Sequence, residues 1–232
     1  MQKFFLIISL LVAVSTAFAQ KAGTVLDDNV VTAQTVDKFF TIEEIDDATF
    51  SRMQRGGSYP EKCTIKRSEL RYLRVLHRNF DGKIQVGELI CNRLIANDLL
   101  KILRELYNNN YQIASMRLID DFGADDERSM LANNTSCFCY RVIKGSSKLS
   151  MHSRGLAIDI NPLQNPCVRY RDGKISNIQP NSTTARKHAN RTAKSHLIDR
   201  NDLCYKFFLQ HGFIWGGAWR SVKDYQHFEK KP

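Results

Sequence analysis

The chain is organised around one stretch near its middle, Ser150-Met151-His152-Ser153-Arg154-Gly155-Leu156-Ala157-Ile158-Asp159-Ile160. Its second half alternates large apolar, small, apolar, acidic and apolar residues, which favours a short strand in a mostly buried sheet. Gly155 stands just before this strand and permits the tight turn that leads into it. A carboxylate on so apolar a strand is costly unless it is paired or binds a cation. His152 and Asp159 are therefore predicted to be two ligands of a catalytic zinc. The alternative is a surface histidine with an acid that bonds a neighbouring loop.

The other half of the predicted site lies near the C-terminus, where Asp224 precedes His227 by three residues, after a Trp-Gly-Gly-Ala-Trp segment. A catalytic zinc typically has three protein ligands and one open position, and two histidines with a carboxylate are an accepted set. His152, Asp159 and His227 fill that set. Asp224 is then free to act as the general base on water. Glu229, two residues beyond His227 on the same strand face, is a rival base or a partner that orients an imidazole.

Together these residues spell Ser-x-His-x6-Asp followed by Asp-x-x-His, a pattern that resembles the M15 family of zinc peptidases. That family includes VanY-type D-alanyl-D-alanine carboxypeptidases and L-alanyl-D-glutamate endopeptidases. The resemblance runs from roughly Val86 to Phe228, and it implies one zinc per chain and hydrolysis of peptidoglycan stem peptides. One residue departs from the pattern, because members commonly have Asp where this chain has Ala218. Ala218 keeps open the alternative of a non-catalytic module of the same fold that binds cell-wall peptides.

Further residues are predicted to support the site. Ser150 is expected to orient it rather than to act as a nucleophile, because a metal would supply the attacking water. A cationic side chain close to the metal would stabilise the oxyanion of a tetrahedral intermediate, and Arg128 and Arg141 are both candidates for that role. Asn134 lies in a stretch that matches the family and is a candidate hydrogen-bond donor to a peptide, with a side-chain-capped turn as the alternative.

We expect an α+β fold, in which a small, mainly antiparallel sheet carries the zinc site and helices pack on its other side. The family resemblance implies the Hedgehog/D-Ala-D-Ala peptidase-like arrangement. Apolar spacing predicts helices over four ranges and strands over four others. The helices are expected over residues 41–54, 68–78, 89–107 and 202–210, and the strands over residues 111–120, 138–143, 156–160 and 225–229. Residues 20–60 are expected to form a partly mobile N-terminal arm, residues 61–232 the metallopeptidase domain, and residues 169–199 a long surface insertion.

The N-terminus reads as a secretory signal peptide over residues 1–19. A charged start is followed by an apolar run and then by Ala17-Phe18-Ala19, so the mature chain is expected to begin at Gln20. The protein is therefore expected to be secreted or periplasmic, without a membrane span after cleavage. The formal net charge of +10 includes Lys3, which leaves 10 − 1 = +9 on the mature chain. An exported basic monomer is expected to meet an anionic cell wall and peptidoglycan peptides rather than nucleic acid.

Six cysteines in an exported chain suggest disulfide bonds: Cys63, Cys91, Cys137, Cys139, Cys167 and Cys204. Sequence does not choose among the possible pairings. Cys137 and Cys139 would project from the same face of a strand, so they are expected to reach separate partners. A cysteine-rich zinc site is the weaker interpretation, because paired C-x2-C spacings are absent.

Overall fold

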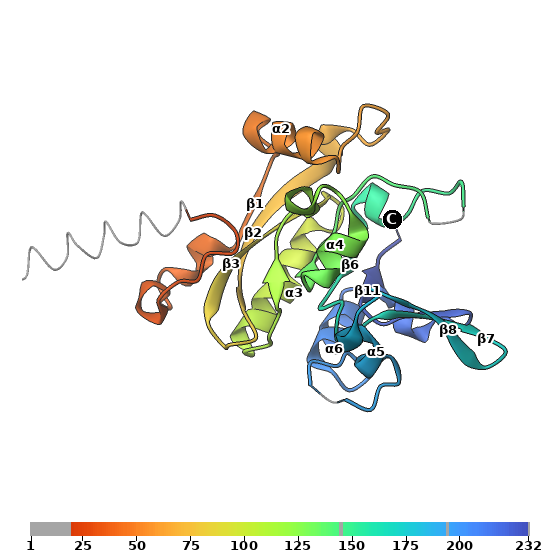
Figure 1. The fold of residues 1–232 in the computed structure, drawn as a ribbon. Helices are drawn as coiled ribbons and strands as arrows, with labels where there is room; N and C mark the ends of the chain where they lie inside the picture. Colours follow the sequence, from red (N-terminus) through yellow and green to blue (C-terminus); the bar gives the residue numbers. More distant parts are fainter. Residues whose placement is uncertain (1–19, 144–145, 194, 232) are drawn as a thin grey trace, which may run out of the picture.

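The computed structural model describes residues 20–231, apart from 144–145 and 194. The predicted signal peptide, residues 1–19, lies outside the described residues. Within them, helices α2 to α6 pack against three small antiparallel sheets, which confirms the predicted α+β class (Figure 1). Among the described helices, none combines the length and the apolar character that crossing a bilayer would require.

The largest sheet is formed by β1 (Thr41–Glu43), β2 (Leu70–Arg78) and β3 (Ile84–Asn92), in that order and antiparallel. Helix α3 (Ala96–Asn108) follows directly and buries its apolar stripe, including Leu99 and Leu103, against one face of this sheet. The helix predicted over residues 89–107 therefore begins later than expected, because its first residues belong to β3.

The helix predicted over residues 68–78 is wrong, since this segment is strand β2. Both faces of the strand are buried. Leu73 and Val75 face α3, whereas Leu70 and Leu76 pack into two further apolar clusters on the other side. Burial on both faces removes the alternation of apolar and polar residues that identifies a half-buried strand. The spacing of the leucines in this strand is therefore also compatible with a helix, which explains the wrong prediction.

The N-terminal arm packs on the large sheet. Its first described part contains two short 3-10 turns, η1 (Asp28–Val30) and η2 (Val36–Phe39). The helix predicted over 41–54 is confirmed only in its second half, because β1 takes residues 41–43 and helix α2 spans Asp47–Gly56. Asp46 caps α2 by accepting a hydrogen bond from the N–H of Thr49.

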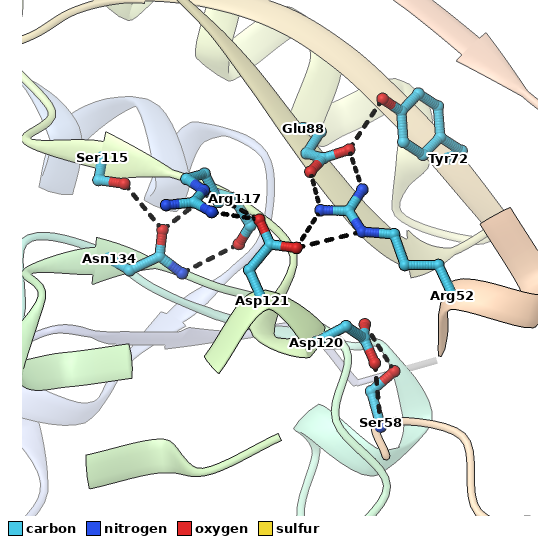
Figure 2. A network of polar contacts seen from close by, with 9 residues as sticks. All are labelled: Arg52, Ser58, Tyr72, Glu88, Ser115, Arg117, Asp120, Asp121 and Asn134. Atoms are coloured by element: carbon cyan, nitrogen blue, oxygen red, sulfur yellow. Dashed lines mark hydrogen bonds and ion pairs between the residues drawn. The ribbon is translucent and has the colours of Figure 1, made fainter. Parts of the chain in front are cut away.

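A polar network fastens α2 to the large sheet (Figure 2). Arg52 donates to both carboxylate oxygens of Glu88 on β3, at 3.0 and 2.7 Å, and to Asp121 at 2.6 Å. Tyr72 donates its hydroxyl to Glu88 at 3.0 Å, and Arg117 donates to Asp121 at 2.6 Å. Each of the four charges on Arg52, Glu88, Asp121 and Arg117 therefore has an opposite charge beside it.

The middle of the chain is less regular than expected. The strand predicted over residues 111–120 reduces to β4 (Ser115–Met116) and the 3-10 turn η4 (Ile119–Phe122). Helix α4 (Asp126–Leu131) and β5 (Asn134–Thr135) follow, and β5 pairs in parallel with β4. The strand predicted over 138–143 is wrong, because its residues form no strand beyond an isolated bridge at Val142.

Two small sheets form the C-terminal half. One has the order β6 (Ala157–Asp159), β11 (His227–Glu229), β9 (Ile214–Trp215), and the other has the order β10 (Val222–Asp224), β7 (Cys167–Arg171), β8 (Lys174–Gln179). The first confirms the strands predicted over 156–160 and 225–229, although both are shorter. The predicted surface insertion contains the β7–β8 hairpin and helix α5 (Thr183–Ala189), and Figure 1 shows the hairpin projecting from the body of the molecule.

Helix α6 (Leu203–Gln210) joins the C-terminal sheet to the main core. It confirms the helix predicted over 202–210, except that Asp202 precedes the helix and caps it by accepting the N–H of Cys204. Phe208 stacks on Phe228 of β11 with ring centroids 4.3 Å apart, and both side chains are fully buried. All six cysteines are free in this structure, so it supports none of the possible disulfide pairings.

Candidate metal centre

His152 is positioned by a 3-10 turn, η5 (His152–Arg154), that ends at Gly155. Gly155 has φ +65°, and a Cβ there would lie 2.6 Å from the backbone nitrogen of Asn92, so this position requires glycine. The turn directs the His152 ring into the protein, where Nδ1–H donates to the carbonyl of Cys137 at 2.6 Å. That bond leaves Nε2 as the nitrogen with a free lone pair.

Strand pairing brings Asp159 and His227 together. They lie directly opposite each other in the antiparallel pair of β6 and β11, so their side chains share one face of the sheet. Asp159 Oδ1 lies 3.0 Å from His227 Nδ1, and Asp159 Oδ2 lies 3.3 Å from His152 Nε2. The two histidine nitrogens that face this carboxylate are themselves 3.2 Å apart.

These distances fit a single metal ion. Two ligand atoms about 2.1 Å from a tetrahedral zinc lie about 3.4 Å apart, close to the separations found here. His152, Asp159 and His227 thus form a group, with both histidines buried and Asp159 partly buried, whose ligand atoms all lie within 4.8 Å of one another and that could hold a metal. The donor set, two imidazoles and one carboxylate, is the one that the sequence predicted.

Asp224 reaches the same site from the end of β10. Its backbone and Cβ lie against Gly216, where an added Cβ would be 2.7 Å from the Asp224 carbonyl oxygen and 3.2 Å from the His227 Cβ. Glycine at 216 therefore allows the backbone there to lie close to Asp224 of β10 and to His227 of β11. Asp224 Oδ1 is buried and has no hydrogen-bond partner in the described part of the chain. A buried carboxylate oxygen without a partner is unusual and has the character of a base awaiting a proton.

The charges of the group influence one another strongly. Burial opposes ionisation of Asp159, but His152 and His227 hold the pKa of that carboxyl far below its usual range. Burial also favours a neutral His227, yet hydrogen bonds to Asp159 and Glu229 raise its pKa to about 10. Burial and the negative charge of Asp159 raise the pKa of Asp224. A cation that binds the cluster would therefore displace a proton from His227.

Glu229 and Trp219 border the cluster. Glu229 Oε2 accepts a hydrogen bond from His227 Nε2 at 3.1 Å, on the side of the ring that faces away from Asp159. This contact matches the predicted orienting role better than the role of a rival base. The Trp219 ring lies beside His227, with ring centroids 5.2 Å apart and the two rings tilted by 52°.

The other predicted supporting residues have different places. Ser150 accepts the N–H of His152 at 3.2 Å, as an orienting residue would. Arg141 forms an ion pair with Asp126, and its charge also interacts with Asp159. Arg128 is exposed on α4, and no hydrogen bond or ion pair within the described residues joins it to the cluster. The structure therefore separates two arginines that the sequence left equivalent.

Asn134 is buried away from solvent and its amide is fully engaged. It accepts from the Ser115 hydroxyl and the Arg117 N–H, and it donates to the Arg117 carbonyl and to Ser129. These bonds hold β4 and β5 together, so its place is structural rather than that of the predicted substrate donor.

Three contributors to the site have no signal in the ligand motif. The Cys137 carbonyl fixes the His152 ring, Gly216 admits Asp224, and Trp219 flanks His227. The Trp-Gly-Gly-Ala-Trp segment before Asp224 was the available signal for the last two. The carbonyl of Cys137 had none, since any residue supplies one.

Comparison with known proteins agrees with this geometry. Residues 144–230 match the M15 family model described as D-alanyl-D-alanine carboxypeptidase, and the matched segment contains all three candidate ligands and Asp224. Comparisons with curated proteins and with solved structures gave no significant match. The family match supports a peptidase of the M15 family and resolves no subtype within it.

Proposed function

We propose that this chain, whose residues 144–230 match the M15 peptidase family model, is an exported zinc enzyme that hydrolyses peptide bonds in peptidoglycan stem peptides. The matched description favours a carboxypeptidase that removes terminal D-alanine, and an L-alanyl-D-glutamate endopeptidase is the alternative within the same family. The basic mature chain suits work at an anionic wall.

One observation carries the proposal. Three metal-binding side chains converge at ligand distance, and beside them Asp224 holds a buried Oδ1 that has no hydrogen-bond partner among the described residues. A purely structural cluster would satisfy that oxygen, because an unpaired buried polar atom costs about 1–3 kcal/mol. A hydrolytic site needs it free to accept a proton.

The metal ligands, Asp224 and Arg141 have separate roles in the proposed hydrolysis. When bound by His152, Asp159 and His227, zinc would supply Lewis acidity that polarises a carbonyl and lowers the pKa of water toward about 7. Asp224 accepts the proton that the attacking water loses and returns it to the leaving amine. The raised pKa of Asp224 suits the first of these transfers, because a carboxylate with a higher pKa accepts a proton more readily. We assign to Arg141, rather than Arg128, the role of offsetting negative charge that develops near Asp159, because only the charge of Arg141 is found to interact with that carboxylate.

Metal content and product analysis test the proposal together. The mature chain from Gln20 should carry about one zinc, and mass spectrometry of digested muropeptides should show loss of D-alanine or a cut after L-alanine. His152→Ala should lose both zinc and hydrolysis. His188→Ala, which removes a histidine from α5 outside the cluster, is the matched control and should keep both.

The outcomes separate an enzyme from the non-catalytic binding module that Ala218 suggested. A chain that binds zinc and muropeptides without releasing products would be the module. A chain that binds no zinc would contradict the proposed enzyme and leave only a metal-free form of the module.

A further inference from the structure

A large cavity lies beside the candidate metal centre, between strand β8 and the start of α4. Its volume is about 890 Å³. Strand β8 contributes five successive residues to one wall, from Ile175 to Gln179, and α4 with its preceding cap contributes Asp125, Asp126, Glu127 and Met130 to the other. A cavity walled along one side by a continuous strand has the shape to hold an extended chain.

Strand β8 is the edge of its sheet. The order β10-β7-β8 places β7 on one side of it, and the cavity lies along its length. Residues 174–177 of β8 are exposed. An edge strand presents unpaired backbone N–H and C=O groups to whatever lies beside it, and an extended peptide can pair with them as an added strand.

The opposite wall is acidic. Asp126 is neutralised by Arg141, whereas Asp125 and Glu127 each use one oxygen to accept a backbone N–H, from Arg128 and Asn181. Their second carboxylate oxygens remain for another donor. Arg186 is the single cation among the residues that line the cavity, so the wall carries net negative charge. A cationic side chain fits it best.

The cavity adjoins the metal centre through Gln226, the residue before His227. The Gln226 side chain is 2% exposed, its Nε2 lies 3.5 Å from the sulfur of Met130 in the cavity wall, and its Oε1 has no hydrogen-bond partner among the described residues. Strand register gives a second link, because Gln179 pairs with Cys167 and Cys167 pairs with Asp224. At about 4.8 Å per strand, the end of β8 lies about 10 Å from the proposed base.

We propose that β8 and the start of α4 form a docking groove that holds a substrate peptide as an added strand. A cationic side chain of that peptide lies against Asp125 and Glu127, and the scissile bond lies farther along, toward Asp224. This inference rests on the proposed function only for the statement that the ligand is a peptide substrate.

Peptide binding without turnover provides the test. The zinc-loaded Asp224→Asn chain would be titrated with fluorescent L-Ala-γ-D-Glu-L-Lys-D-Ala-D-Ala and with its counterpart that has norleucine in place of lysine. The lysine peptide should bind roughly five-fold more tightly at low salt, and the difference should shrink at high salt. Amide hydrogen exchange over residues 174–179 should slow when the peptide binds, because added-strand hydrogen bonds protect these groups.

Two further variants on the same background locate the effect. Glu127→Gln keeps an acceptor for the Asn181 N–H but removes the charge, so it should reduce the lysine preference. Glu105→Gln makes the same change on the exposed face of α3 and should leave the preference intact. Equal binding of the two peptides, or unchanged exchange over 174–179 in the bound state, would overturn the inference.

These results can be told apart from failure of the proposed function. A parent chain that cleaves the lysine peptide while its Asp224→Asn variant shows no lysine preference keeps the function and loses the groove. A parent chain that cleaves nothing, with a variant that prefers lysine and protects β8, keeps the groove and loses the function.

Discussion

Two groups of acidic side chains stand in different parts of this molecule, and they differ in the cations that face them. On the large sheet, Glu88 and Asp121 are surrounded by the guanidinium groups of Arg52 and Arg117 and by the Tyr72 hydroxyl (Figure 2). In the C-terminal half, Asp159 and Glu229 pair with the imidazoles of His152 and His227, and one Asp224 oxygen has no hydrogen-bond partner in the described chain.

The difference lies in the kind of cation. A guanidinium keeps its charge at any pH a protein meets, so the Arg network is complete and needs no ligand. An imidazole can give up its proton and offer a lone pair to a metal instead. The first cluster holds α2 on the sheet, whereas the second keeps charge and ligand atoms available for chemistry. Three experiments can break or sharpen this contrast.

The largest effect is expected from Asp224→Asn. Hydrolysis should fall by about 10²–10⁴-fold, because the base is lost. Zinc content should stay the same, and the melting temperature should hold or rise, since a buried acid without a full set of partners is removed. Steady-state kinetics and thermal unfolding would measure both. Asp172→Asn in the exposed β7–β8 turn is the control, and a variant that hydrolyses stem peptides at the parental rate would show that the base is another group.

The next largest effect is a loss of stability in acid, and it comes from a histidine in the large sheet. His77, on β2, is buried with Nδ1 at 2.8 Å from the carbonyl of Ile113, and burial lowers its pKa to about 4. The unfolded chain takes up this proton near pH 6.5, so stability is complete above that value and declines as pH falls toward 4, by up to about 3 kcal/mol.

Chemical denaturation of the metal-free protein across this pH range would measure the decline. His77→Gln should flatten it. An equally steep decline in the variant would assign the acid sensitivity to other groups.

A smaller effect is expected from Glu88→Gln, which removes the central charge of the Arg network. The cost should be about 2 kcal/mol in the free energy of unfolding, less than for a fully buried pair, because Arg52 is partly exposed and keeps Asp121. Hydrolysis per folded molecule should not change. Urea unfolding and kinetics would show this, with Glu61→Gln on the surface as control. A lower rate at unchanged stability would instead tie the network to the active site.

Sequence alone identified the residues that form the candidate site. The ligands His152, Asp159 and His227, and the neighbouring Asp224, could be named because metal-binding residue types at these spacings are a strong local pattern. Short strands around them followed from alternation at 156–160 and from the turn glycines. Helices α3 and α6 could also be predicted. Each has one exposed side, so its apolar residues recur at helical spacing.

Only the tertiary structure decided the rest. Strand β2 was invisible because burial on both faces erased its alternation, and the partnership of Arg52 with Glu88 depends on contacts between segments far apart in the chain. The same is true of the β8 edge beside α4 and of the choice between Arg141 and Arg128. Local spacing specifies which groups a strand or turn presents, whereas strand register and packing specify which groups they meet.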